Sequence, residues 1–146
     1  MFSLSAHRRS RCRSTLARAG RRGVAAVEFA VVAPIFFMLV VGIIEVGRAL
    51  MVQQVLINAS RVGARRAVML SSSQDAVVDA ATEFAEGIGV PGVDVAVSPD
   101  PASAATGAAV TVAVSIDFAD VSWLPAPWLM GGKVLSASSV MRKEGF

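Results

Sequence analysis

Between Val24 and Ile44 the chain reads VAAVEFAVVAPIFFMLVVGII, and Glu28 is the only ionisable side chain in this run. An α-helix rises about 1.5 Å per residue, so about 20 apolar residues cross the hydrocarbon core of a bilayer, which is about 30 Å thick. Pro34 lies inside the run, where a membrane helix tolerates it as a kink. The run is too long and too bulky for the apolar core of a secretory signal, and no A-x-A cleavage site directly follows it. We therefore expect one transmembrane helix.

The ionisable residues are divided unevenly along the chain. Of the 14 Lys and Arg residues, seven are arginines within residues 1–23, a segment without any acidic residue. From Val24 onward the other seven face 11 Asp and Glu, so this part has a formal charge of −4, against +3 for the whole chain. Nucleic-acid binding is disfavoured because no aromatic or helical register arranges the arginines on one face. Basic flanks of membrane helices stay in the cytoplasm, so residues 1–23 predict a disordered cytoplasmic leader.

The junction between leader and helix, residues 21–29, reads RRGVAAVEF. Gly23 offers a peptidase an unhindered, non-helical residue, and cleavage after it would create an α-amine on Val24. A carboxylate near the centre of a membrane helix costs about 2.5–3.5 kcal/mol on insertion scales and usually marks a function. Glu28 lies one turn beyond Val24, so it is placed to pair with this amine or with that of a neighbouring subunit. Alternatively, Glu28 lies near the interface and its carboxylate extends to the lipid headgroups. The pattern is typical of a precursor that a prepilin peptidase cleaves.

Helical periodicity continues beyond the membrane segment, from Glu45 to Leu70. Polar residues recur in steps of four, three and four, and apolar residues recur at a similar spacing. The polar positions are Gln54, Asn58, Arg61 and Arg65, and the apolar positions are Val52, Val55, Ala59 and Val62. One long helix, apolar in its first half and amphipathic in its second, explains both stripes. We expect the polar stripe to contact the rest of the domain or another subunit, or to face solvent.

A second helix is predicted between a capping pair, Ser72 and Asp75, and a stop at Gly87. One of its faces is apolar and another is acidic. The apolar face holds Val77, Ala81, Phe84 and Ile88, and the acidic face holds Asp75, Asp79, Glu83 and Glu86. No non-carboxylate ligand is placed to complete a metal shell, so we expect a solvated face in preference to a cation site.

After residue 92 the apolar period changes to two, which indicates strands. Alternation covers residues 93–97 and, most regularly, 110–118, and a last strand is expected at Lys133–Arg142. A loop rich in Trp and Pro, residues 121–132, precedes it, and we expect its tryptophans to pack at the edge of the domain. The loops are too short for crossover helices, so the strands should pair antiparallel.

These patterns predict an α+β fold in which a small antiparallel sheet packs on the amphipathic half of the long helix. The expected parts are a basic leader at 1–23, a transmembrane helix at 24–46, an amphipathic extension at 47–70 and a small α+β domain at 71–146.

Three blocks between Gly23 and Arg66 resemble the TadE-like family, the minor pilin-like proteins of the tight-adherence (Flp) pilus system. The first block contains Gly23 and, in Glu28-Phe29-Ala30 and Pro34, the family's opening. The second and third blocks supply the matching positions Glu45, Gly47, Arg48, Ser60, Arg61, Gly63, Ala64 and Arg65. The resemblance implies a pilin-like fold and a pseudopilin role in Flp pilus assembly, Tad secretion and cell adhesion.

The resemblance also implies maturation between Gly23 and Val24, with Glu28 and Phe29 serving recognition and assembly. The expected partners are the prepilin peptidase, other pilin-like subunits, Tad assembly proteins of the bacterial inner membrane and membrane lipid, and neither nucleic acid nor a small-molecule substrate. The chain should cross the inner membrane once, with its C-terminal domain in the periplasm. Beyond residue 23 there is neither His nor Cys, so we expect no enzyme, no cofactor and no metal. The rival hypothesis is an uncleaved, signal-anchored periplasmic scaffold without a pilus role.

Overall fold

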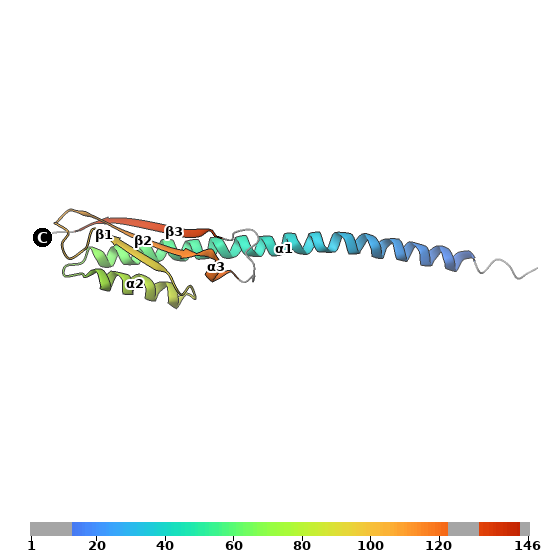
Figure 1. The fold of residues 1–146 in the computed structure, drawn as a ribbon, viewed down its shortest axis with the longest axis horizontal. Coiled ribbons are helices and arrows are strands. Elements are labelled where there is room, and N and C mark those ends of the chain that lie inside the picture. Colours follow the sequence, from blue (N-terminus) through green and yellow to red (C-terminus); the bar gives the residue numbers. More distant parts are fainter. Residues whose placement is uncertain (1–12, 123–131, 144–146) are drawn as a thin grey trace, which may run out of the picture. The chain divides into compact units, whose positions relative to one another are not determined.

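The computed structural model describes the backbone of residues 13–122 and 132–143, and the side chains of these residues from position 23 onward. The elements in chain order are α1 (Arg13–Ala67), α2 (Gln74–Gly87), β1 (Asp94–Ser98), β2 (Ala109–Asp117), α3 (Phe118–Val121) and β3 (Val134–Arg142) (Figure 1). The predictions for the tryptophans, at positions 123 and 128, and for the first 12 residues of the leader lie outside the described residues.

Helix α1 contributes to two compact units, which divide between Gly42 and Ile43. Among the described residues, α1 from Gly23 onward is the one helix long and apolar enough to cross a membrane, and none of its most apolar stretch is buried. The bulky exposed side chains include Val27, Phe29, Ile35, Phe36, Phe37, Met38 and Leu39. Apolar side chains exposed all round a helix suit a lipid environment. The structure is therefore consistent with a single-pass membrane protein.

The second half of α1 is amphipathic, as predicted. Its buried apolar residues are Ala49, Val52, Val55, Leu56, Ala59, Ala64 and Ala67. The polar stripe of Gln54, Asn58, Arg61 and Arg65 is exposed. The expectation that this stripe contacts the rest of the domain is therefore wrong, because smaller apolar residues occupy the face that the sheet and α2 cover.

Helix α2 begins one residue later than its predicted cap implies. The N-cap is Ser73, whose Oγ accepts a hydrogen bond from the backbone N–H of Ala76 at 3.3 Å. Ser72, the predicted cap, is instead buried, and its Oγ has no partner among the described residues. The helix ends at Gly87 as expected. A side chain on the exposed side of the turn is free to reach the orphan N–H groups, whereas a buried one is held in the core.

The buried face of α2 holds Val77, Ala81 and Ala85. The prediction is confirmed for Val77 and Ala81, and the half-buried Phe84 packs against the same core, but Ile88 is 45% exposed. The four acidic residues predicted for the opposite face are all exposed.

Three antiparallel strands form the sheet in the order β1-β2-β3, as the period-two pattern predicts. The central strand β2 turns Val110, Val112, Val114 and Ile116 into the core and leaves the alternate residues on the other face. The predicted alternation ends one step too late, because Phe118 is the first residue of α3. Asp117 caps this helix by accepting a hydrogen bond from the Ala119 N–H at 3.0 Å. Phe118 is nevertheless fully buried.

Gly63 marks the point where α1, α2 and β2 meet. A Cβ at this position would lie 3.0 Å from Val112 Cγ1 on β2 and 3.4 Å from Ala81 Cβ on α2. The inner face of the sheet and the buried faces of α1 and α2 form one hydrophobic core around this contact. The absence of a side chain on α1 thus allows three elements to pack closely.

We predict that Gly63→Val lowers the free energy of unfolding by about 1–3 kcal/mol, because the added methyl groups overlap Val112 and Ala81. Urea unfolding of the full chain in detergent, followed by tryptophan fluorescence, measures this. Gly47→Val is the matched control, since a Cβ at Gly47 meets nothing within 4 Å and the change alters only helix propensity, by less than about 1 kcal/mol. Equal stabilities for the two variants would contradict the packing argument.

Candidate functional site

The residues that the sequence singled out fall on two stretches of α1, one in each compact unit. The first stretch runs from Gly23 to Pro34, and the second from Glu45 to Arg65. Among the side chains of residues 23–122 and 132–143, no group of three or more His, Cys, Asp or Glu is placed to hold a metal ion. The candidate site consists of the exposed surface of α1 and of the contacts that α1 makes with the rest of its unit.

Gly23 lies within α1, which extends back to Arg13. The expectations of a non-helical Gly23 and of a disordered leader are therefore wrong for residues 13–23. Extending an existing helix needs no new nucleus, and arginine, alanine and leucine all favour the helical state. A peptidase acts on an extended bond, so cleavage at this position would require the helix to open locally around Gly23. Glycine makes this opening easier, because it is less favourable than alanine in a helix by about 1 kcal/mol.

Glu28 is exposed on α1, as are Val27, which directly precedes it, and Val24, one turn earlier. Phe29 is 71% exposed. Within the described residues, Glu28 makes no hydrogen bond or ion pair. The carboxylate of Glu28 is thus placed on a surface that is otherwise apolar. Pro34 lies inside the helix and is also exposed.

Glu45 and Arg48 have a different role, because their side chains form hydrogen bonds that join α1 to the end of the short helix α3. Glu45 is only 4% exposed, and its Oε1 accepts a hydrogen bond from Ser122 Oγ. Arg48 donates from Nε to the carbonyl oxygen of Val121 at 3.1 Å. A buried carboxylate is destabilising unless hydrogen bonds replace its lost hydration. Both side chains therefore stabilise the folded unit.

The third block also contains a buried polar side chain that is hydrogen-bonded within the unit. Ser60 is fully buried; its Oγ donates to the carbonyl oxygen of Ile57 at 2.9 Å and lies 2.9 Å from Ser139 Oγ on β3. Because the Ser60 hydrogen is used by Ile57, Ser139 is the donor in the second bond. Gly63 and Ala64 face the core beside Ser60.

Three of the singled-out positions do not join these contacts. Arg61 and Arg65 are exposed, and a Cβ at Gly47 would meet nothing within 4 Å. The structure therefore brings together Glu45, Arg48, Ser60, Gly63 and Ala64 as contacts of α1 with the rest of its unit, and leaves Gly47, Arg61 and Arg65 on the surface.

Sequence reasoning missed the partners of these residues. Ser122 and Ser139 lie 77 and 79 positions away from Glu45 and Ser60. Gln53 was also missed; its Nε2 donates to the Ser136 carbonyl oxygen on β3 at 2.9 Å. For Glu45 the available signal was a glutamate between the apolar residues Ile44 and Val46, since a buried polar group requires a partner.

We predict that Glu45→Ala lowers the free energy of unfolding by about 1–3 kcal/mol, because it removes the buried acceptor of Ser122 Oγ. Glu45→Gln should restore most of this stability, since its amide oxygen remains an acceptor. Urea unfolding in detergent measures both variants. Exposed Glu86→Ala is the control and should change stability by less than about 0.5 kcal/mol. If Glu45→Ala were as stable as this control, the assigned contact would be wrong.

A model of the TadE-like protein family matches residues 23–65. Comparisons with curated proteins and with solved structures give no match. The matched stretch contains the apolar half of α1 with the exposed Glu28. It also contains the residues between Glu45 and Ala64 through which α1 contacts the rest of its unit. Over residues 23–65, the chain is therefore similar to the TadE-like family.

Proposed function

We propose that the chain is a pseudopilin-like structural component of the tight-adherence (Flp) pilus and secretion apparatus. The observation that carries this proposal is the family match, which falls on an apolar helix that bears a carboxylate and carries a folded unit on its second half. Pilin-like subunits need these two properties, because their helices associate within a bilayer while their domains form a surface outside it. The chain acts through assembly and is not an enzyme.

Maturation is the first step of this function. A prepilin peptidase of the inner membrane cleaves between Gly23 and Val24 and removes the basic leader. The arginines of the leader hold the N-terminal side in the cytoplasm, so the unit from Ile43 onward is periplasmic. Cleavage also releases the mature helix from seven positive charges, which oppose movement of the helix out of the membrane.

Lateral association of helices is the second step. The side chains of α1 in its apolar half are exposed in the single chain, which leaves them available to lipid and to the helices of other pilin-like subunits. Within this surface, the Glu28 carboxylate pairs with the Val24 amine of a neighbour. An ion pair in an apolar environment sets the axial register of two helices because misplacing either charge leaves the other unpaired. The Tad assembly proteins of the inner membrane act on the resulting complex.

Maturation can be tested directly. The membrane-associated protein should begin at Val24 when the prepilin peptidase is present, and should retain Met1 when that peptidase is deleted. N-terminal sequencing of the purified protein measures this. A chain that keeps Met1 in the presence of an active peptidase would support the uncleaved scaffold instead.

The Glu28→Gln variant tests the assembly step. It should be cleaved at Gly23 and stay in the membrane, but should abolish pilus formation, because losing one member of a buried pair costs about 3–5 kcal/mol. Electron microscopy of the cell surface, together with immunoblotting of membranes, measures both results. Glu28→Asp keeps the charge and should retain part of the piliation. Normal piliation with Glu28→Gln would show that the carboxylate is dispensable and merely extends to the interface.

A further inference from the structure

The exposed surface of α1 in the second compact unit changes its chemistry between Met51 and Gln54. From Ile43 to Met51, every exposed residue is apolar or glycine, and from Gln54 to Ala67 every exposed residue is polar or charged. The first set, which we call the apolar patch, comprises Ile43, Ile44, Val46, Gly47, Leu50 and Met51. The second set comprises Gln54, Asn58, Arg61, Arg65 and Arg66. A change this sharp along one helix indicates a boundary between two surroundings.

The apolar patch is wide. At 3.6 residues per turn, its side chains point in directions that extend from Val46 round to Ile44, over about 160° of the helix circumference. Leu50 is 63% exposed and Ile43 is 64% exposed. One partner helix covers a narrow seam of a helix, whereas lipid covers every direction that the protein leaves open. The width of the patch therefore favours lipid over a single partner helix.

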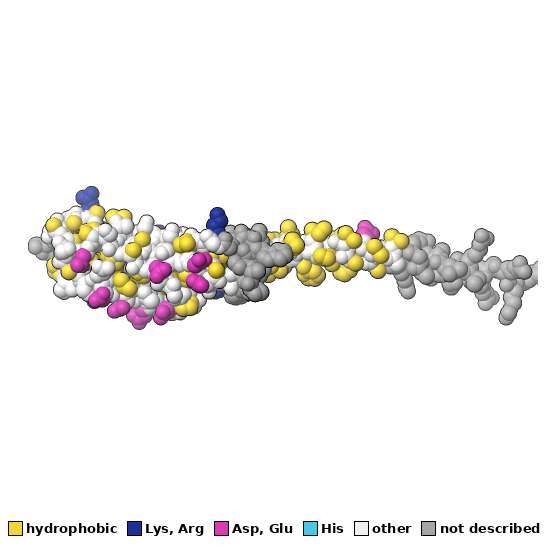
Figure 2. Space-filling model, viewed as in Figure 1, with side chains coloured by type: hydrophobic (Ala, Val, Ile, Leu, Met, Phe, Trp, Pro, Cys, Tyr) yellow, Lys and Arg dark blue, Asp and Glu magenta, His cyan; other side chains and the backbone are white. Residues whose placement is uncertain are grey.

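The patch also continues the apolar half of α1, on whose visible face Figure 2 shows hydrophobic side chains. From Phe29 to Met51, no exposed residue is ionisable. A helical stretch of this length spans about 33 Å, slightly more than the hydrocarbon core of a bilayer, which is about 30 Å thick. A helix that crosses obliquely accommodates such an excess. Lipid can therefore extend along α1 as far as Met51.

The side of α1 opposite the apolar patch is polar at the same level. Glu45 and Arg48 form hydrogen bonds to the end of α3 there. Asp117 and Asp120, at the N-cap and within α3, are both exposed. Exposed carboxylates require water, so lipid can border this level of the unit only on the side of the patch. The asymmetry is that of a helix that leaves the lipid obliquely, with the patch against lipid and α3 in water.

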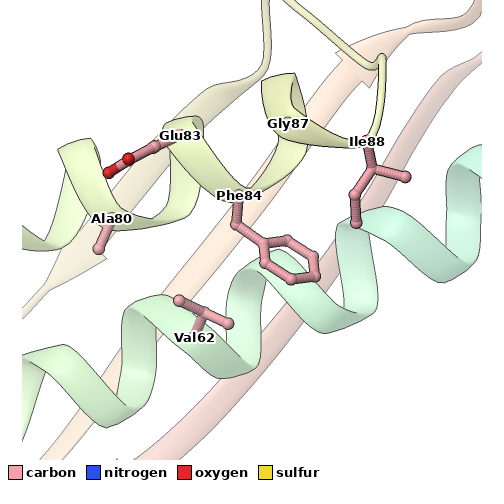
Figure 3. Close-up of a pocket in the computed structure, with 6 residues that line it drawn as sticks. All are labelled: Val62, Ala80, Glu83, Phe84, Gly87 and Ile88. Atoms are coloured by element: carbon pink, nitrogen blue, oxygen red, sulfur yellow. The ribbon is translucent and has the colours of Figure 1, made fainter.

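The second unit has another open apolar surface, a groove between α1 and α2 (Figure 3). Phe84 of α2 extends its ring toward α1 beside Val62, and Ile88, just after α2, is 45% exposed. Glu83 also lines this groove, and acidic side chains gather along the margin of the unit in Figure 2 where α2 lies in Figure 1. Carboxylates disfavour contact with lipid. The groove therefore provides apolar side chains that should stay in water.

We propose that the apolar patch lies in the lipid of the membrane that α1 crosses, so that the second unit rests against the bilayer with this face. The inference rests on the proposed membrane insertion of α1 and not on the pilus role. On this side the lipid-facing surface ends at Met51, beyond the end at residue 46 that the sequence predicts. The hydrogen bonds of Glu45 and Arg48 then hold α3 beside the lipid boundary.

Cysteine labelling in nanodiscs tests the lipid contact. Full-length Met51→Cys and Ile88→Cys proteins, each in a Cys12→Ser background, are reconstituted at one chain per disc and treated with a maleimide that does not enter lipid. The native side chains are equally exposed, at 46% and 45%. We expect Met51→Cys to react at least about tenfold more slowly, because a thiol in apolar surroundings ionises poorly. Asn58→Cys, two turns further along α1, should react as fast as Ile88→Cys.

Ile35→Cys, in the apolar half of α1, shows whether the helix has inserted. Protection at Ile35 together with equal rates at Met51 and Ile88 would overturn the proposal alone. Rapid labelling at Ile35 would overturn membrane insertion and the proposal with it. Neither result depends on the prepilin peptidase or on pili, so both are distinct from a failure of maturation or of piliation.

Bilayer thickness identifies what covers the patch. Thinner lipid uncovers first the residues nearest its boundary, so Met51→Cys should react at least about threefold faster in dimyristoyl than in dioleoyl phosphatidylcholine. Ile88→Cys should react equally fast in both lipids, and Ile35→Cys should stay protected in both. A slow reaction at Met51 that does not change with thickness would show that protein, from this chain or from a partner, covers the patch. That outcome would overturn the assignment to lipid.

Discussion

Close approach of α1 to the sheet is the constraint on which the rest of the second compact unit, from Ile43 onward, depends. The approach requires that the facing side of α1 carry little volume, and Gly63, with alanines at 59 and 64, meets this requirement. A Cβ at Gly63 would already press on Val112 at 3.0 Å. The larger side chains of the core come from the sheet, from Phe118, from Val77 of α2 and, nearer the start of the unit, from Val52 and Leu56 of α1. Around Gly63, small residues on the helix thus pack closely against branched residues on the sheet.

Polar contacts then fix the position of the helix against this apolar face. Glu45 and Arg48 bind the C-terminal end of α3, and Gln53 and Ser60 bind β3 further along α1. Apolar packing is non-directional, whereas hydrogen bonds of this kind are satisfied at only one axial position of α1. Apolar packing supplies the stability of the unit, and these side chains select a single arrangement.

The sequence predicted the order of the two long helices and the three strands, and most of their apolar faces, because periods of 3.6 and 2 are local properties. It could not place Phe118, since an alternating residue at the end of a strand looks the same whether or not an Asp117 cap starts a helix after it. Ser72 and Ser73 posed the same ambiguity at α2, where burial decides which hydroxyl caps. The third kind of failure was Gly23, where a continuing helix overrides the preference of glycine for other conformations. In each case the deciding contact depends on a neighbouring element.

Glu28 and Glu45 show how environment separates two identical side chains on one helix. Glu45 is buried and its carboxylate is hydrogen-bonded within the folded unit, so the chain itself satisfies it. Glu28 is exposed on the apolar half of α1 and has no partner among the described residues. In lipid an unpartnered carboxylate is strongly disfavoured, and no fold of the second unit relieves it. The partner of Glu28 must therefore come from the headgroups or from a second helix. A carboxylate that a second helix satisfies favours association, whereas one that its own chain satisfies selects a single folded arrangement.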